Sequence, residues 1–174
     1  MCFLIFMFVR AEGRAAKAGD TQRSGSVRIF VDADACPVKA EVARVALRCQ
    51  LPVYFVSNSG MQIPAGAGLE LVLVDGGFDA ADDWIAERAE SGDLVVTADI
   101  PLAARCVKAG AWVLDFKGGV FSEASIGEAV ARREMLSKLR EMGAVTGGPA
   151  PFDKRDRSAF LQQMDRVIQA QKRK

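Results

Sequence analysis

The sequence predicts an α/β domain of three layers, in which helices cover both faces of a doubly wound, mainly parallel five-stranded sheet and a helical extension follows at the C-terminus. Five short apolar runs, rich in β-branched residues, are typical of parallel strands buried on both faces. These runs are residues 27–31, 53–57, 69–74, 93–98 and 111–115. Helical patterns alternate with them, as they do in βαβ units.

Three helices are predicted between these strands. The first has an apolar face of Val38, Val42, Val45, Ala46 and Cys49, with Glu41, Arg44 and Arg48 on the predicted solvent face. The second uses Ala81, Trp84, Ile85 and Arg88, and the third covers 101–109 and opens with Pro101. Residues 58–68 show no helical pattern, so we expect an irregular connection there.

Two more helices are predicted beyond the fifth strand. One begins at a capping box of Ser125 and Glu128 and ends at Gly143, and the last runs from about Asp156 to about Ala170. We expect residues 27–170 to form one domain and 171–174 a basic tail. Residues 1–26 are predicted to be a flexible leader, or a stretch upstream of a true start at Val27.

Composition excludes several kinds of chemistry. The chain of 174 residues has no histidine, which excludes Ser-His-Asp and Cys-His catalysis and His-ligated zinc. Its four cysteines form no CxxC pair and are predicted to be reduced, mostly core thiols of a cytoplasmic protein. The apolar N-terminal run of nine residues is too short to span a bilayer. Catalysis would therefore use carboxylates, hydroxyls, lysines or a metal ion held by oxygen ligands.

The charges are unevenly distributed along the chain. Residues 29–100 carry twelve Asp or Glu and four Lys or Arg, whereas residues 101–174 carry eight acidic and fourteen basic residues. This asymmetry suits a metal centre beside a surface for phosphates, although ordinary solvated charge explains it equally well.

Carboxylates follow three of the five predicted strands. The first strand ends in Asp32 and Asp34, the third is followed by Asp75, Asp79, Asp82 and Asp83, and the fourth by Asp99. Carboxyl ends of parallel strands share one edge of a sheet, where ligands bind. Asp34, Asp79 and Asp99 could each cap a helix. Taken together, so many carboxylates should repel one another unless a cation neutralises them, and Mg²⁺ or Mn²⁺ prefers such oxygen ligands.

Several blocks of the sequence resemble the YaiI/YqxD family of bacterial proteins. They are "VDADACPVKAEV", "GFDAADDWI", "GDLVVTADIPLAARCVKAGA", "TGGP" and "RDRSAF", and the resemblance covers roughly residues 27–168. The chain departs from the family at "DFKGGVF", where an Arg-Gly pair is usual and Lys117 is a partial substitute. More distantly, the layout is similar to PIN-like nuclease domains, with Asp32, Asp79 with Asp82 or Asp83, and Thr97-x-Asp99 in the acidic positions.

These resemblances imply a metal-dependent nuclease or phosphodiesterase that acts on nucleic acid, with RNA favoured over DNA. Asp32, Asp79, Asp82 and Asp99 would be catalytic and bind one or two Mg²⁺ or Mn²⁺ ions, with Asp34 and Asp83 as further ligands. The predicted substrate-binding residues are Lys39, Ser57, Asn58, Thr97, Arg155 and Arg157. The oligomeric state stays open, a dimer included.

Two alternative functions remain at this point. "FVDAD" and "FVSNSG" resemble motifs of haloacid-dehalogenase-type phosphatases, in which Asp32 would be the nucleophile, Asp34 the general acid and Ser57 a phosphate ligand. The other alternative is a non-catalytic protein whose basic C-terminal region binds RNA, ribosomes or a protein partner.

Overall fold

A six-stranded sheet forms the centre of the computed structural model, which describes residues 27–77, 79–144 and 151–173. The strand order is β3-β2-β1-β4-β5-β6. Five strands are parallel: β1 (Ile29–Asp32), β2 (Val53–Ser57), β3 (Leu69–Leu73), β4 (Leu94–Val96) and β5 (Trp112–Leu114). The sixth, β6 (Val120–Phe121), is antiparallel to β5.

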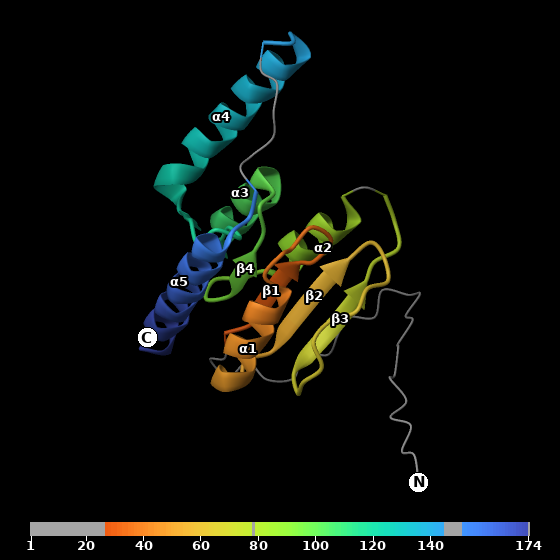
Figure 1. Ribbon diagram of the computed structural model, residues 1–174, viewed down its shortest axis with the longest axis vertical. Coiled ribbons are helices and arrows are strands. Elements are labelled where there is room, and N and C mark those ends of the chain that lie inside the picture. Colours follow the sequence, from red (N-terminus) through yellow and green to blue (C-terminus); the bar gives the residue numbers. More distant parts are fainter. Residues whose placement is uncertain (1–26, 78, 145–150, 174) are drawn as a thin grey trace.

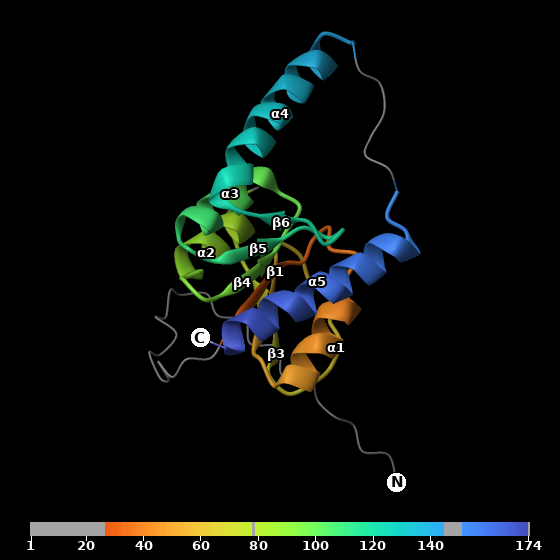
Figure 2. The ribbon, with the colours of Figure 1, turned by 90° about the vertical axis from the view of Figure 1, so that its left-hand side faces the viewer.

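Helices cover both faces of this sheet. On one face lie α1 (Lys39–Cys49) and α5 (Lys154–Lys172), and on the other lie α2 (Ala80–Arg88) and α3 (Ile100–Lys108). The remaining helix, α4 (Glu123–Glu141), lies beside α3 and then projects beyond the rest of the domain (Figures 1 and 2). No helix among the described residues is both long enough and apolar enough to cross a membrane.

The central strand shows how the two cores are built. Ile29 and Val31 belong to the core under α1 and α5, whereas Phe30 belongs to the core under α2 and α3. Successive side chains of a strand point to opposite faces, so Asp32 lies on the face of Phe30, toward α2 and α3. The same alternation places Thr97, two residues after Val95, on that face too.

The five predicted strands and the helix-free connection between β2 and β3 are confirmed, and the fold class is α/β with a mainly parallel sheet. The predicted number of strands is wrong by one. Strand β6 has only two residues, which are too few to show an alternating pattern, and it pairs with β5 through a tight turn at Gly118.

Two local predictions are wrong. The α4 capping box consists of Ser122 and Ser125, because the helix begins one turn earlier than the Ser125–Glu128 pattern indicated. Glu41 is buried and not on a solvent face, with 3% of its surface exposed, because α5 packs over that side of α1. The predicted leader and the "TGGP" block lie outside the described residues.

The α5 helix confirms the predicted C-terminal extension and begins at a capping box of Asp153 and Asp156. Its buried residues are Phe160, Met164, Val167 and Ile168. They pack into the same core as Ile29 and Val31, so the extension is part of the domain.

Replacing Gly118 with alanine should destabilise the protein by about 2 kcal/mol or more. Gly118 has a φ of +90°, and a Cβ built there would lie 2.8 Å from the backbone carbonyl of Ala159 in α5. Chemical denaturation measures the loss. Gly127→Ala is the matched control: it meets nothing within 4 Å in the exposed part of α4 and should stabilise the protein by roughly 0.5–1 kcal/mol. Equal effects of the two changes would contradict the close packing of the turn against α5.

Candidate functional site

The order of the strands reverses between β1 and β4, because the chain adds β2 and β3 on one side of β1 and β4, β5 and β6 on the other. In open parallel sheets, ligands bind beyond the carboxyl ends of the strands at such a reversal point. Asp32 ends β1, and Thr97 directly follows β4. The two predicted site residues are therefore neighbours at the position that the topology favours for a ligand.

A hydrogen-bonded chain links the ends of β1 and β4. The hydroxyl of Thr97 donates to Oδ2 of Asp32 at 2.9 Å, and the backbone N–H of Asp99 donates to the Thr97 hydroxyl at 3.0 Å. Oδ1 of Asp99 accepts the N–H of Leu102 at 2.9 Å and so caps α3. Thr97 is fully buried and Asp32 is half-buried. These hydrogen bonds hold the carboxylates of Asp32 and Asp99 in fixed orientations.

Helix α2 places the carboxylate of Asp82 near Asp32 and Asp99, whereas the carboxylate of Asp83 points to Arg105. Asp82 is half-buried, and the charges of Asp99, Asp32 and Asp79 all act on it. Asp83 is exposed and forms an ion pair with Arg105 at 2.6 Å. Asp79 is exposed at the N-cap position of α2 without a capping hydrogen bond from its side chain. The core of the site is therefore Asp32, Asp82 and Asp99, with Asp79 at its margin.

Burial and repulsion by neighbouring carboxylates both oppose the ionisation of Asp82 and Asp32. Burial raises the pKa of Asp82 to about 6, and the charges of Asp99, Asp32 and Asp79 add to the rise, while Arg105 opposes it. Burial also raises the pKa of Asp32, against the hydrogen bond from Thr97. Like charges therefore share a partly desolvated space, as carboxylates do where a cation is to be bound.

Asp34 lies in a different set of contacts. It accepts hydrogen bonds from the Ser57 hydroxyl at 2.5 Å, the backbone N–H of Asn58 at 3.0 Å and the Ser59 hydroxyl at 3.4 Å. Ser57 is fully buried at the end of β2. Asp34, Ser57 and Asn58 thus join the loops that follow β1 and β2.

The predicted phosphate-binding side chains are largely engaged by the protein itself. Lys39 donates to the carbonyl of Ala33 at 2.8 Å, and Arg157 donates to Oε1 of the buried Glu41 at 2.5 Å. Oε2 of Glu41 has no hydrogen-bond partner in the described part of the chain. Arg155 is exposed in the first turn of α5. Arg157 therefore joins α5 to α1.

Lys117, the partial substitute for the family's arginine, forms an ion pair with Asp156 at 3.3 Å. It thereby connects the β5–β6 turn to the start of α5, at the same end of that helix as the contact with Glu41.

The sequence reasoning missed one basic residue at the site. Arg133 of α4 lies 4.0 Å from Oδ2 of Asp99. Its position could have been found from the sequence only by noting that it continues the row formed by Ile126 and Val130, at spacings of four and three residues along a helix.

The side chains as placed do not form a closed metal cage. Among residues 27–77, 79–144 and 151–173, no three acidic or thiol side chains stand close enough together to hold a metal ion. The oxygen donors of Asp32, Asp82 and Asp99 suit Mg²⁺ or Mn²⁺ in chemical type, and their spacing would have to contract around the ion.

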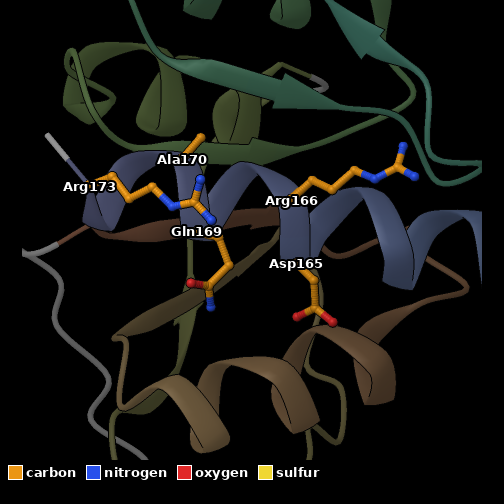
Figure 3. A pocket seen from close by; sticks show the side chains of 5 residues that line it. All are labelled: Asp165, Arg166, Gln169, Ala170 and Arg173. Atoms are coloured by element: carbon orange, nitrogen blue, oxygen red, sulfur yellow. The ribbon is translucent and has the colours of Figure 1, made fainter.

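Two other candidates for a functional site, the thiol of Cys36 and a hollow on α5, are less suited to catalysis. Burial raises the pKa of Cys36 to about 12, so its thiol stays protonated as expected for a core residue. A shallow hollow of about 350 Å³ lies on α5 (Figure 3) and is lined by Asp165, Arg166, Gln169, Ala170 and Arg173. It lies on the C-terminal half of α5, whereas the carboxyl edge of the sheet is near that helix's N-terminus.

Asp82→Asn should stabilise the metal-free protein at pH 7 by roughly 1 kcal/mol, a value discounted for solvent screening of this partly exposed group. Because the pKa of Asp82 is raised, the folded state binds more protons than the unfolded state between about pH 4 and 6, so stability falls as the pH rises through this window. The gain should therefore vanish near pH 4. Urea unfolding across this range, with Asp83→Asn as the control, measures it. A gain independent of pH would contradict the assignment.

Arg157→Gln should destabilise the protein by about 2 kcal/mol, because the charge of the buried Glu41 would be compensated only by the exposed Arg44, 3.5 Å away. Arg155→Gln, which removes the same charge two residues away, should change the unfolding free energy by less than about 0.5 kcal/mol. The double variant Glu41→Gln with Arg157→Gln should recover part of the loss. Equal losses in the two arginine variants would show that the contact with Glu41 is unimportant.

Comparison with known proteins identifies relatives over most of the chain. A model of a family described as "Uncharacterized BCR, YaiI/YqxD family" matches residues 30–170. A UPF0178 protein of Rhodopseudomonas palustris strain BisB18 is 56% identical over 141 residues, which cover 81% of this chain and 91% of the relative. A UPF0178 protein of Azorhizobium caulinodans is 54% identical over 151 residues, covering 87% and 95%. No solved structure matches significantly. The chain therefore belongs to the YaiI/YqxD family of bacterial proteins.

Proposed function

We propose that the protein is a metal-dependent phosphodiesterase that cleaves nucleic acid, RNA in preference to DNA, at the carboxyl edge of its sheet. The observation that carries the proposal is that carboxylates from three separate segments lie near enough for their charges to act on one another. Asp32 comes from the end of β1, Asp82 from α2 and Asp99 from the start of α3. Their charges act on one another at the point where the strand order reverses.

The α/β fold with its mainly parallel sheet is compatible with a PIN-like nuclease domain, which is the resemblance that the acidic positions suggested. In this proposal Asp32, Asp82 and Asp99 hold one or two Mg²⁺ or Mn²⁺ ions, and Asp79 is an outer ligand. The bound ion would lower the pKa of a water molecule and stabilise the charge on the phosphate. This metal-ion chemistry needs no imidazole, so it is compatible with a chain that has no histidine.

The surrounding groups have defined tasks. Thr97 fixes the orientation of Asp32 through its hydrogen bond, and the cap on α3 does the same for Asp99. Helices α2 and α3 both begin at this edge, so the positive ends of their dipoles favour a bound phosphate. Asp83 forms an ion pair with Arg105, so in this proposal it neutralises that arginine and does not bind the metal ion.

The phosphatase alternative receives less support. It requires Asp34 as a general acid beside the Asp32 nucleophile. Asp34 instead accepts hydrogen bonds from the backbone N–H of Asn58 and from the Ser57 hydroxyl, which is the group proposed to bind phosphate. The non-catalytic alternative predicts no metal binding, so a binding experiment separates it from our proposal.

Adding Mn²⁺ should raise the melting temperature of the wild-type protein, because an ion that binds the folded state alone stabilises it. At an ion concentration of about 100 times Kd the stabilisation should be about 2.7 kcal/mol. Asp32→Asn and Asp82→Asn should each abolish most of this shift and also the cleavage of a labelled RNA. The matched control Asp83→Asn, one residue further along α2, should retain both.

The proposal fails if Mn²⁺ and Mg²⁺ leave the melting temperature of the wild-type protein unchanged. It also fails if Asp83→Asn removes the shift while Asp82→Asn leaves it intact.

A further inference from the structure

Helix α4 passes the candidate site because it packs along α3 in the opposite direction. Glu123 and Ile126, near the start of α4, line a small hollow with Ala104, Val107 and Lys108, which lie between the middle and the end of α3. About two turns beyond Ile126, Arg133 lies beside Asp99 at the beginning of α3. The two helices therefore run antiparallel, and α4 continues beyond the carboxyl edge of the sheet (Figures 1 and 2).

Arg133 occupies an unusual position on α4. Ile126 packs against the core under α2 and α3, and Val130 is half-buried one turn later. Arg133 follows at the next step of the same row, since residues three and four apart lie on one side of a helix. A guanidinium thus continues an apolar row at the point where α4 passes the carboxylates.

The contact between Arg133 and Asp99 is loose. Their closest nitrogen and oxygen atoms lie 4.0 Å apart, which is too far for a hydrogen bond, and 57% of the Arg133 side chain is exposed. By contrast, Arg105 lies 2.6 Å from Asp83 and Arg157 lies 2.5 Å from Glu41. Arg133 is therefore attracted to the carboxylates and keeps N–H donors for another anion.

We infer that Arg133 is the phosphate-binding arginine of this site and contacts a non-bridging oxygen of the phosphodiester that is cleaved. This inference rests on the proposed function. A cation among the carboxylates would neutralise Asp99 and weaken its attraction for Arg133. The guanidinium then has the geometry to bind phosphate oxygens by two parallel hydrogen bonds.

The matched pair Arg133→Gln and Arg132→Gln tests the inference. Both variants lose one positive charge from exposed positions of α4, but Arg132 does not belong to the row that reaches Asp99. Arg133→Gln should reduce Mn²⁺-dependent cleavage of a labelled RNA by about 100-fold, as expected for the loss of a donor to the transition state. Arg132→Gln should reduce it less than about threefold.

The Mn²⁺-induced rise in melting temperature separates a phosphate-binding role from a structural one. Arg133→Gln should retain that rise, because Arg133 is not a metal ligand, and Arg133→Lys should recover part of the cleavage by supplying the charge without the bidentate geometry. If Arg133→Gln and Arg132→Gln cleave equally well while Mn²⁺ still binds, Arg133 has no such role and the proposed function survives. If the wild-type protein neither binds Mn²⁺ nor cleaves RNA, the proposed function fails and the inference fails with it.

Discussion

The hydrogen bond from Thr97 to Asp32 joins the ends of two strands that are far apart in the chain, β4 and β1. It lies where the order of the strands in the sheet reverses. Strand β1 is paired on both sides and covered on both faces, so its last residue cannot turn away into solvent. A carboxylate in that position is partly desolvated, and its ionisation is opposed. Helices α2 and α3 begin at the same edge of the sheet as this carboxylate. Asp82 in the first turn of α2 and Asp99 at the N-cap of α3 therefore lie near Asp32.

Two further helices frame this edge from opposite sides. The contact between Arg157 and Glu41 docks the start of α5 onto the start of α1, while the contact between Arg133 and Asp99 places the middle of α4 beside α3. The first arginine compensates a buried charge and is part of the fold. The second is exposed and only loosely held, so it remains available for a ligand. Two residues of the same type thus have different roles, and burial and distance distinguish them.

Much of the site could be predicted from the sequence because the relevant signals are local. The apolar strands mark where the carboxyl edge lies, and the residues that follow them, Asp32 and Asp99, fall there without further information. Asp82 and Asp83 could not be distinguished, since the direction of neighbouring side chains depends on how α2 rotates against the sheet. Only the structure shows that Asp83 turns to Arg105.

Two of the features that sequence reasoning missed depend on contacts between separate segments of the chain. Glu41 resembles a solvent-facing residue until α5 packs over it, 116 residues further along the chain. Arg133 resembles one more surface charge until α4 is known to run antiparallel to α3. Strand β6, with its two residues, gives no periodic signal at all.

In the function proposed above, Asp32, Asp82 and Asp99 together hold a divalent cation. Anomalous diffraction from crystals grown with Mn²⁺ tests it most directly, because the scattering locates the ion itself. We expect a peak within coordination distance of oxygen atoms from at least two of these three carboxylates. Ordered density for all three side chains with no anomalous peak between them, at an ion concentration that saturates any binding seen in solution, would contradict it.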